Sequence, residues 1–154
     1  MKFKLQYCIQ LFVIVLFVNS LHAQKTFKKF YHITRNSGLS QSTINTIVKD
    51  RTGFIWFGTD DGLNRYNGYT VQHFKHDEND YTTIGLGRVH CIYISKSGQM
   101  WVGTDQGGLD LYDENTERFV HFKSGIEHVV AAATNDIRGI LETADNRLWL
   151  GCYE

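Results

Sequence analysis

The sequence predicts an all-β fold in which a four-stranded unit recurs about every 45 residues. Its three tryptophans are separated by 45 (101 − 56) and 48 (149 − 101) residues. Turn-forming residues stand three positions before each tryptophan and a glycine stands two positions after it, at Gly53, Trp56 and Gly58, at Gly98, Trp101 and Gly103, and at Asn146, Trp149 and Gly151. Between them lie short runs rich in β-branched and aromatic residues, which favour strands over helices.

Each unit is expected to contain four strands joined by tight turns. In the first unit the expected strands are residues 44–50, 54–59, 63–67 and 69–76, and the second unit repeats the plan with VHCIYIS, QMWVGT, LDLYD and RFVHFK. Four strands per unit of this length are typical of a propeller blade. We therefore expect a partial β-propeller of about two and a half four-stranded blades: blade 1 at 41–83, blade 2 at 84–128 and a truncated blade 3 at 129–154.

The recurring residues have a structural interpretation. We expect Trp56, Trp101 and Trp149 to be wedged between neighbouring blades, because they recur in every copy. The glycines that follow them, Gly58, Gly103 and Gly151, are expected to allow close backbone approach or a bulge.

The N-terminal residues resemble an export signal. Two lysines precede an apolar run centred on residues 11–18, and Ala23 offers a cleavage point, so residues 1–23 are expected to be a signal peptide. The alternative is an uncleaved membrane anchor, but the run is shorter than the ~20 apolar residues that a spanning helix needs. Residues 24–40 are expected to be an N-terminal lead-in or latch strand segment that pairs into the last blade of a closed ring.

Composition excludes some classes of protein. Lys+Arg and Asp+Glu each number 16 in the 154 residues, so nothing indicates a general binder of nucleic acids or membrane surfaces. Cys91 and Cys152 remain after the leader and could form a disulfide, but both lie in apolar runs, which favours two buried free thiols.

Motifs for catalysis, metals or cofactors are not found. The sequence lacks a phosphate-binding loop and a nucleophile elbow, and the segment DDGLNRYNG lacks the alternating ligands of a calcium loop. His73 and His121 occupy equivalent places in their repeats, which favours a structural role over a metal pair. We therefore expect no catalytic residue, no metal site, no cofactor and no enzymatic activity in this chain.

A binding site is expected on the propeller face where the inner strands begin. In the register of the repeat, Asn45, His90 and Arg138 are equivalent. Polar residues that differ between copies are better ligand candidates than those that recur, although each can equally be a solvated loop charge. The candidates are Arg88, Asp136 and Arg138 on the inner strands, with Asp60, Asp61, Asp105 and Gln106 in the turns.

These residues carry a family resemblance. The segment DRTGFIWFGTDDGLNRYNGYTVQHF (50–74) resembles the two-component regulator propeller repeat, whose usual form is D-x-x-G-x-x-W-x-G-T-x-x-G-L-x-x-Y-[DN]-G-x-x-F. The second copy has Ser95 in place of the aspartate and one extra glycine. The third has Thr143 in place of the aspartate and Cys152 in place of the threonine.

The resemblance implies the exported sensor region of a bacterial sensor histidine kinase, many of which are hybrid proteins. It implies a periplasmic location in an inner-membrane protein, with partners outside this segment: the remaining blades, a membrane helix and a kinase core. It also implies a small carbohydrate ligand from polysaccharide breakdown. Because propellers close with about four to eight blades, we expect the chain to be a piece of a longer protein. The alternative is an exported propeller that acts as an independent enzyme or interaction scaffold.

Overall fold

The computed structural model describes residues 29–123 and 134–154, and the chain divides into two units, Met1–His32 and Ile33–Glu154. The expected signal peptide lies outside the described residues, as does the expected junction between blades 2 and 3 near residue 128. Residues 29–34 contain neither helix nor strand, so the pairing of the latch segment stays a prediction. In the described ranges, no helix is long and apolar enough to cross a membrane.

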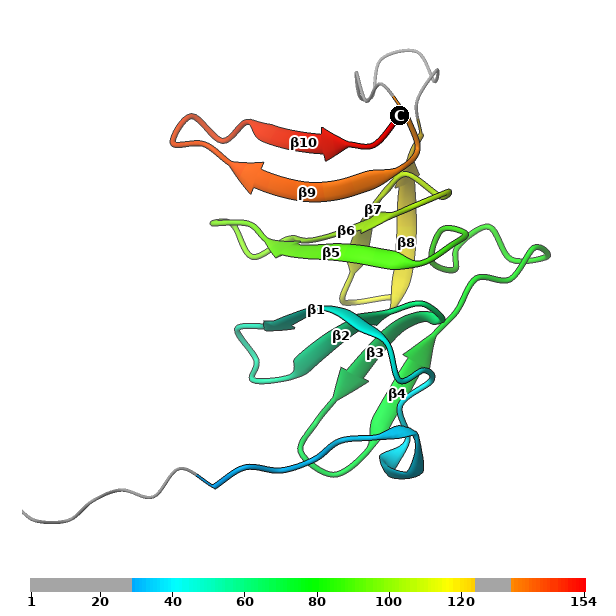
Figure 1. Cartoon of the computed structure of the whole chain (residues 1–154). Coiled ribbons are helices and arrows are strands. Elements are labelled where there is room, and N and C mark those ends of the chain that lie inside the picture. Colours follow the sequence, from blue (N-terminus) through cyan, green and yellow to red (C-terminus); the bar gives the residue numbers. More distant parts are fainter. Residues whose placement is uncertain (1–28, 124–133) are drawn as a thin grey trace, which may run out of the picture. The chain divides into compact units, whose positions relative to one another are not determined.

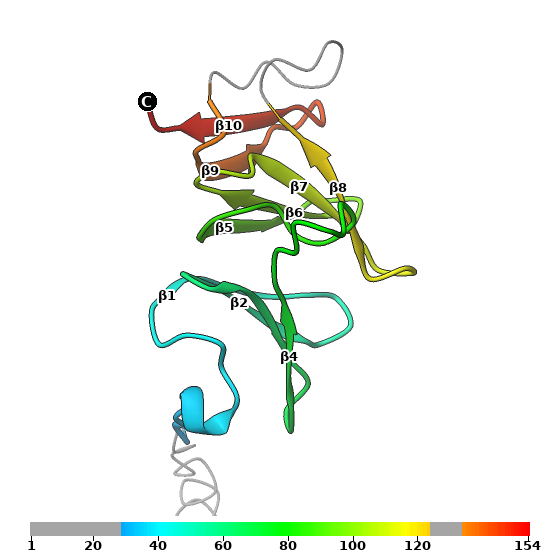
Figure 2. The ribbon, with the colours of Figure 1, turned by 90° about the vertical axis from the view of Figure 1, so that its right-hand side faces the viewer.

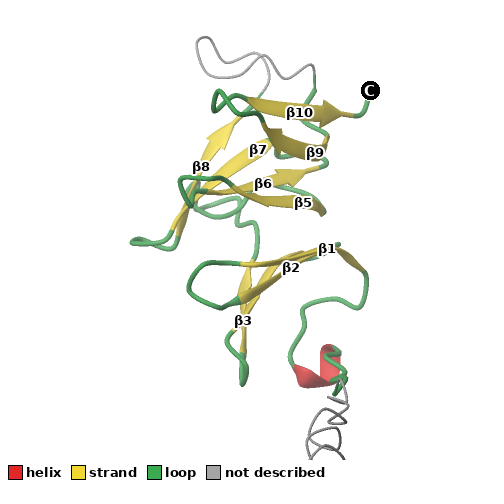
Figure 3. Cartoon of the chain, turned by 90° about the vertical axis from the view of Figure 1, so that its left-hand side faces the viewer, coloured by secondary structure: helices red, strands yellow, loops and turns green. Residues whose placement is uncertain are grey.

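The second unit contains three antiparallel sheets, which confirms the all-β prediction of about two and a half blades (Figure 1). A short 3-10 helix, η1 (Arg35–Ser37), precedes them (Figure 3). Blades 1 and 2 have four strands each in sequence order, and blade 3 has two. The strands are β1 (Ile44–Lys49), β2 (Ile55–Thr59), β3 (Gly62–Tyr66), β4 (Val71–Phe74), β5 (Val89–Ile94), β6 (Met100–Thr104), β7 (Leu109–Asp113), β8 (Arg118–Phe122), β9 (Ile137–Glu142) and β10 (Leu148–Cys152).

The fourth strand is shorter than expected. Strand was predicted over 69–76, whereas β4 begins at Val71. The Asn67 side chain accepts hydrogen bonds from the backbone N–H groups of Tyr69 (2.9 Å) and Thr70 (2.8 Å), so the chain is still turning there. This local turn competes with strand pairing, so the prediction was wrong at this end.

Blades 1 and 2 share one hydrophobic core. Trp56 is buried, and its ring centroid lies 5.5 Å from that of Phe74 in its own blade and 5.1 Å from that of Tyr112 in the next. Trp56 therefore lies between the two blades. The core residues are Trp56, Leu63 and Phe74 of blade 1, Ile84 of the connection, and Val89, Met100, Val102, Tyr112 and Phe119 of blade 2.

Glycines let the first strands of blades 2 and 3 approach the blade before them. A Cβ atom on Gly58 would lie 2.5 Å from Val89 Cγ1, and one on Gly103 would lie 2.8 Å from Ile137 Cγ2. Both distances are shorter than real contacts, so the packing of β5 on blade 1 and of β9 on blade 2 requires glycine. The third copy differs, since the nearest atom to such a Cβ on Gly151 is 3.7 Å away.

The tryptophan of the third copy has a different environment from the first. The side chain of Trp149 is 63% exposed, whereas that of Trp56 is 2% exposed, and Trp101 is half-buried with its ring 5.4 Å from that of Phe122. Trp56 is covered by Tyr112 from the third strand of the next blade. The part of the chain that the structure describes gives blade 3 no third or fourth strand and no following blade, so Trp149 lacks this cover.

Basic residues join the turns at one end of neighbouring blades. Arg51, in the β1–β2 turn, donates a hydrogen bond to the backbone carbonyl of Lys96 in the β5–β6 turn. Lys96 in its turn donates through Nζ to the carbonyl of Thr143, which begins the β9–β10 turn (2.8 Å). We call this pair of contacts the turn clasp. Ala144 stands at the equivalent place in the third copy and cannot continue it.

Candidate functional site

The first strand of each blade carries a β-bulge at the same place. In β1 the register steps from Ile44 to Thr46, which leaves Asn45 unpaired. The same step leaves out His90 in β5 and Arg138 in β9. These first strands lie side by side through the three blades (Figure 1). Because a bulge re-aims the extra side chain, the three blades present one polar side chain each at the same end of the unit.

In blades 1 and 2 the bulged side chain meets an aspartate from the turn after the second strand. Asn45 Nδ2 donates to Asp60 Oδ1 at 3.0 Å, and it also reaches the carbonyl of Val89 at 3.1 Å. His90 Nε2 lies 3.8 Å from Asp105 Oδ2. Within the described residues, this nitrogen is the one buried side-chain polar atom that lacks a hydrogen bond.

Arg88 completes the cluster in blade 2. Its backbone N–H donates to Asp105 Oδ1 and its Nε donates to Oδ2, each at 2.8 Å. Partial burial acts to raise the pKa of Asp105, but the hydrogen bonds from Arg88 outweigh it and hold that pKa below its ordinary value. The same contact raises the pKa of Arg88. The aspartate is therefore charged, and the exposed guanidinium of Arg88 is held beside the bulge.

Blade 3 uses an arginine as its bulged residue. Arg138 binds Asp136 through two hydrogen bonds, from Nε (2.5 Å) and Nη2 (2.7 Å). Its guanidinium carbon lies 5.1 Å from the centroid of the Tyr153 ring, within cation–π distance. The Tyr153 ring is 64% exposed, so this end of blade 3 offers an aromatic face beside a charge pair.

The structure brings five of the seven predicted ligand candidates together. Asp60 and Arg138 lie close enough to Arg88 for their charges to affect its pKa, which Asp60 raises and Arg138 lowers. By contrast, Asp61 is paired with Lys75 (2.6 Å), and Gln106 lies exposed in the turn after β6. Ligand binding by these residues stays a prediction. We call the five assembled candidates, together with the bulged residues Asn45 and His90, the bulge row: Asn45, Asp60, Arg88, His90, Asp105, Asp136 and Arg138.

Sequence reasoning missed a buried charge pair that anchors the connection from β4 to β5. Asp110 on β7 is fully buried, accepts the backbone N–H of Gly85 (2.7 Å) and lies 2.6 Å from His121 Nδ1. His121 Nε2 lies 2.9 Å from the carbonyl of Tyr81. When Asp110 is ionised, both ring nitrogens face acceptors and His121 is the imidazolium. Figure 2 shows this connection, residues 75–88, passing beside β8.

The anchor in blade 1 uses neutral groups at the equivalent positions. Asn64 is fully buried, accepts the backbone N–H of Ser40 (2.9 Å) and donates to Ser40 Oγ (2.9 Å). His73 Nε2 lies 2.5 Å from the carbonyl of Gly38. The recurrence of His73 and His121 was the signal that could have revealed both anchors, because each histidine is paired in register with the buried Asn64 or Asp110.

Asp50 was also missed as a structural centre. Its carboxylate accepts the N–H groups of Thr52, Gly53 and Phe54, and it accepts the indole Nε1–H of Trp56 at 2.7 Å. Burial acts to raise its pKa, but these bonds lower it overall. The side-chain hydroxyls of Ser95 and Thr143, at the same place in the other copies, form hydrogen bonds only within their own turns.

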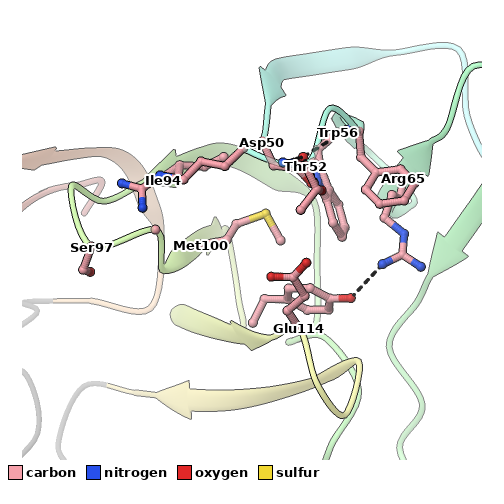
Figure 4. A pocket seen from close by; sticks show the side chains of 12 residues that line it. Asp50, Thr52, Trp56, Arg65, Ile94, Ser97, Met100 and Glu114 are labelled. Atoms are coloured by element: carbon pink, nitrogen blue, oxygen red, sulfur yellow. Dashed lines mark hydrogen bonds between the residues drawn. The ribbon is translucent and has the colours of Figure 1, made fainter.

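A cavity of about 240 Å³ lies between blades 1 and 2, at the opposite end of the strands from the bulge row (Figure 4). Blade 1 contributes the Asp50 turn, Trp56 and Arg65, and blade 2 contributes the Ser97 turn, Met100, Tyr112 and Glu114. Figure 4 shows Met100 and Glu114 pointing into the space between the blades. We call this space the interblade cavity; no residue of it was among the predicted candidates.

Cys91 and Cys152 are free thiols, each partly buried. Burial raises the pKa of Cys91 to about 11, which keeps it protonated and unreactive at neutral pH.

The architecture and the repeated bulge define the class of protein: a propeller built from blades of one sequence repeat. Three segments of the chain, 38–61, 83–106 and 132–154, match the family described as two component regulator propeller. The chain thus carries repeats of the two-component regulator propeller family, as the motif predicted.

The chain spans only a small part of the length of the proteins to which it is similar. Histidine kinase P4 from Formosa agariphila is 40% identical over 65 residues, which are 42% of this chain and 5% of that protein. The extracellular domain of a proposed hybrid two-component system from B. thetaiotaomicron superposes with a TM-score of 0.69 at 24% identity, over 78% of this chain and 17% of that one. A second such domain from the same organism gives a TM-score of 0.64 at 26% identity, over 82% of this chain and 18% of that one.

Proposed function

We propose that this chain forms part of the periplasmic, ligand-sensing propeller of a two-component sensor histidine kinase. The observation that carries the proposal is the match of three successive segments to two-component regulator propeller repeats. The similarity to a histidine kinase and to extracellular domains of two-component systems supports it. The role of the segment is binding, and catalysis belongs to a kinase core elsewhere in the protein.

The proposal includes partners that this segment would need. Further blades would cover the exposed face of Trp149, and a membrane helix would connect the propeller to the kinase. A small carbohydrate would bind at the bulge row, where Arg88, Arg138 and Asp105 can form charged hydrogen bonds to hydroxyl groups. Ligand binding would act by changing the relative stability of two arrangements of the propeller and its partner domain.

The first experiment is to determine the coding sequence beyond codon 154. Further Trp-x-Gly-Thr repeats, a spanning helix and a kinase histidine would support the sensor role. A verified stop codon directly after Glu154 would contradict it, because the sensor would have no output.

The second experiment tests the ligand site by thermal shift with oligosaccharides on the intact propeller. Arg138→Ala removes a member of the bulge row, and Arg147→Ala is its matched control, since Arg147 pairs with Asp145 (3.0 Å) at the far end of the same blade. We expect Arg138→Ala to abolish the ligand-induced shift and Arg147→Ala to retain it. Equal behaviour of the two variants would remove the bulge row from the proposal.

A further inference from the structure

The interblade cavity combines an apolar floor with polar groups from two blades. Phe54, Ile94 and Met100 supply apolar surface, and Tyr112 and Glu114 stand at its blade 2 side. Its volume of about 240 Å³ is below the ~300–1,000 Å³ of pockets for drug-sized ligands, so it suits a single small ring.

Two polar groups of the cavity keep hydrogen-bonding capacity. The Tyr112 hydroxyl accepts a hydrogen bond from Arg65 Nη1 (3.2 Å), so its own hydrogen is left to donate. Burial raises the pKa of Tyr112 to about 12, so the hydroxyl keeps that hydrogen at neutral pH. The Glu114 carboxylate forms no hydrogen bond or ion pair within the part of the chain that the structure describes.

Asp50 and Arg65, two other polar residues of the cavity, already form hydrogen bonds or ion pairs. Asp50 uses both carboxylate oxygens within its own turn and on Trp56. Arg65 pairs with Glu117 and Gln72 through Nη2, and its guanidinium carbon lies 4.9 Å from the centroid of the Phe54 ring. These contacts fix the walls of the cavity, and we assign ligand recognition to Tyr112 and Glu114 on blade 2.

The charges around the cavity balance. The carboxylates of Asp50 and Glu114 oppose an anion, and the guanidinium groups of Arg51 and Arg65 oppose a cation. The binding of a neutral ligand therefore has the smallest electrostatic cost. A hydroxyl group can both donate to Glu114 and accept from Tyr112, so a ring that carries hydroxyl groups meets both requirements.

We propose that the interblade cavity binds a neutral, hydroxyl-rich ring of the size of one monosaccharide unit, with Glu114 accepting and Tyr112 donating hydrogen bonds. This site goes beyond the proposed sensor role, since it lies at the opposite end of the blades from the bulge row. Because both blades line it, its ligand would also strengthen the contact between them.

The test is a titration of the full chain, followed by NMR, with glucose, galactose, mannose and xylose as neutral probes. Galacturonate and glucosamine serve as anionic and cationic probes of similar size. Tyr112→Phe removes one hydrogen bond, and Glu114→Gln replaces a charge-assisted hydrogen bond with a weaker neutral one, so each should weaken binding of the neutral probe about tenfold. Two controls should leave it unchanged: Glu78→Gln, the same substitution on an exposed loop, and Arg147→Ala on blade 3. Arg88→Ala is measured in parallel and reports binding at the bulge row.

The outcomes separate this proposal from the sensor role. Loss of binding in Glu114→Gln and Tyr112→Phe, with retention in both controls, supports the cavity site. Loss in Arg88→Ala alone overturns the cavity site and leaves the proposed function in place. Failure of every neutral probe to bind, or stronger binding of galacturonate or glucosamine, overturns the proposal as stated. Since Glu114 is exposed and forms no hydrogen bond or ion pair among the described residues, Glu114→Gln tests the site without disturbing the fold.

Discussion

In blades 1 and 2, a buried side chain on the third strand binds the chain segment that precedes the first strand, but the two blades use different chemical groups for this contact. Blade 1 uses the amide of Asn64 to bind Ser40, whereas blade 2 uses the carboxylate of Asp110 to bind Gly85 and His121. The side chains are fully buried in both cases. The comparison teaches that the repeat retains the position of a buried acceptor on the third strand, while its charge is free to differ.

The largest difference between the anchors should appear on truncation. Asp110→Ala leaves the Gly85 N–H unpaired and the His121 imidazolium without its counter-charge, so we expect a loss of about 3–5 kcal/mol. Asn64→Ala leaves only neutral groups unpaired and should cost about 1–3 kcal/mol. Urea unfolding of the two variants measures both, and equal losses would show that the charge of the pair is irrelevant.

The second difference concerns the turn before the tryptophan. Asp50→Ser gives blade 1 the residue that blade 2 has at this place and removes the acceptor of the Trp56 indole. We expect a loss of about 2 kcal/mol in the free energy of unfolding. Asp50→Asn is the matched control because it keeps an acceptor oxygen. A loss as large in the control as in the serine variant would mean that charge matters here more than the hydrogen bond.

The third difference is a dependence on pH that only the charged anchor explains. Burial raises the pKa of Asp110, and the contact with Asp110 raises that of His121, so the folded pair holds more protons than the unfolded chain. For His121, the stabilisation is present in full below its unfolded pKa of about 6.5 and is lost as pH rises through its raised folded pKa.

The measurement is the free energy of unfolding between pH 5.5 and 8.5. We expect the original chain to lose stability across this interval and Asp110→Asn, which gives blade 2 the amide of blade 1, to show a smaller decline. An unchanged slope in Asp110→Asn would assign the effect to groups outside the pair.

The smallest effect should come from the turn clasp between the blades. Arg51→Ala removes an exposed hydrogen bond to the carbonyl of Lys96, so we expect a loss of about 0.5 kcal/mol. Lys96→Ala, which acts between blades 2 and 3, is the companion variant. Losses above 2 kcal/mol in either would show that the turns, rather than the shared core, hold the blades together.

The sequence was sufficient for the architecture because the repeat is visible in one-dimensional spacing. Gly58 and Gly103, singled out for close approach, do face Val89 and Ile137 of the following blades. The strand limits were less predictable, because the hydrogen bonds of Asn67 that delay β4 depend on side-chain geometry as well as on residue type.

The candidate site was predictable in part. Equivalence in the repeat placed Asn45, His90 and Arg138 together, but the bulge that re-aims them adds no residue that stands out in the sequence. The interblade cavity depends on residues such as Asp50 and Glu114 that lie 64 positions apart (114 − 50) and meet only when two blades pack. No local pattern brings such residues together.

The three bulges are positions where the side chain differs between blades while the pairing of the strands stays the same. A residue inside a regular ladder contributes its backbone to the pairing, so its replacement disturbs neighbours on the next strand. Asn45, His90 and Arg138 lie outside the ladder, and an amide, an imidazole and a guanidinium occupy the same position while the surrounding register is unchanged. Each blade thus contains one place where new recognition chemistry can be installed without redesigning the sheet that supports it.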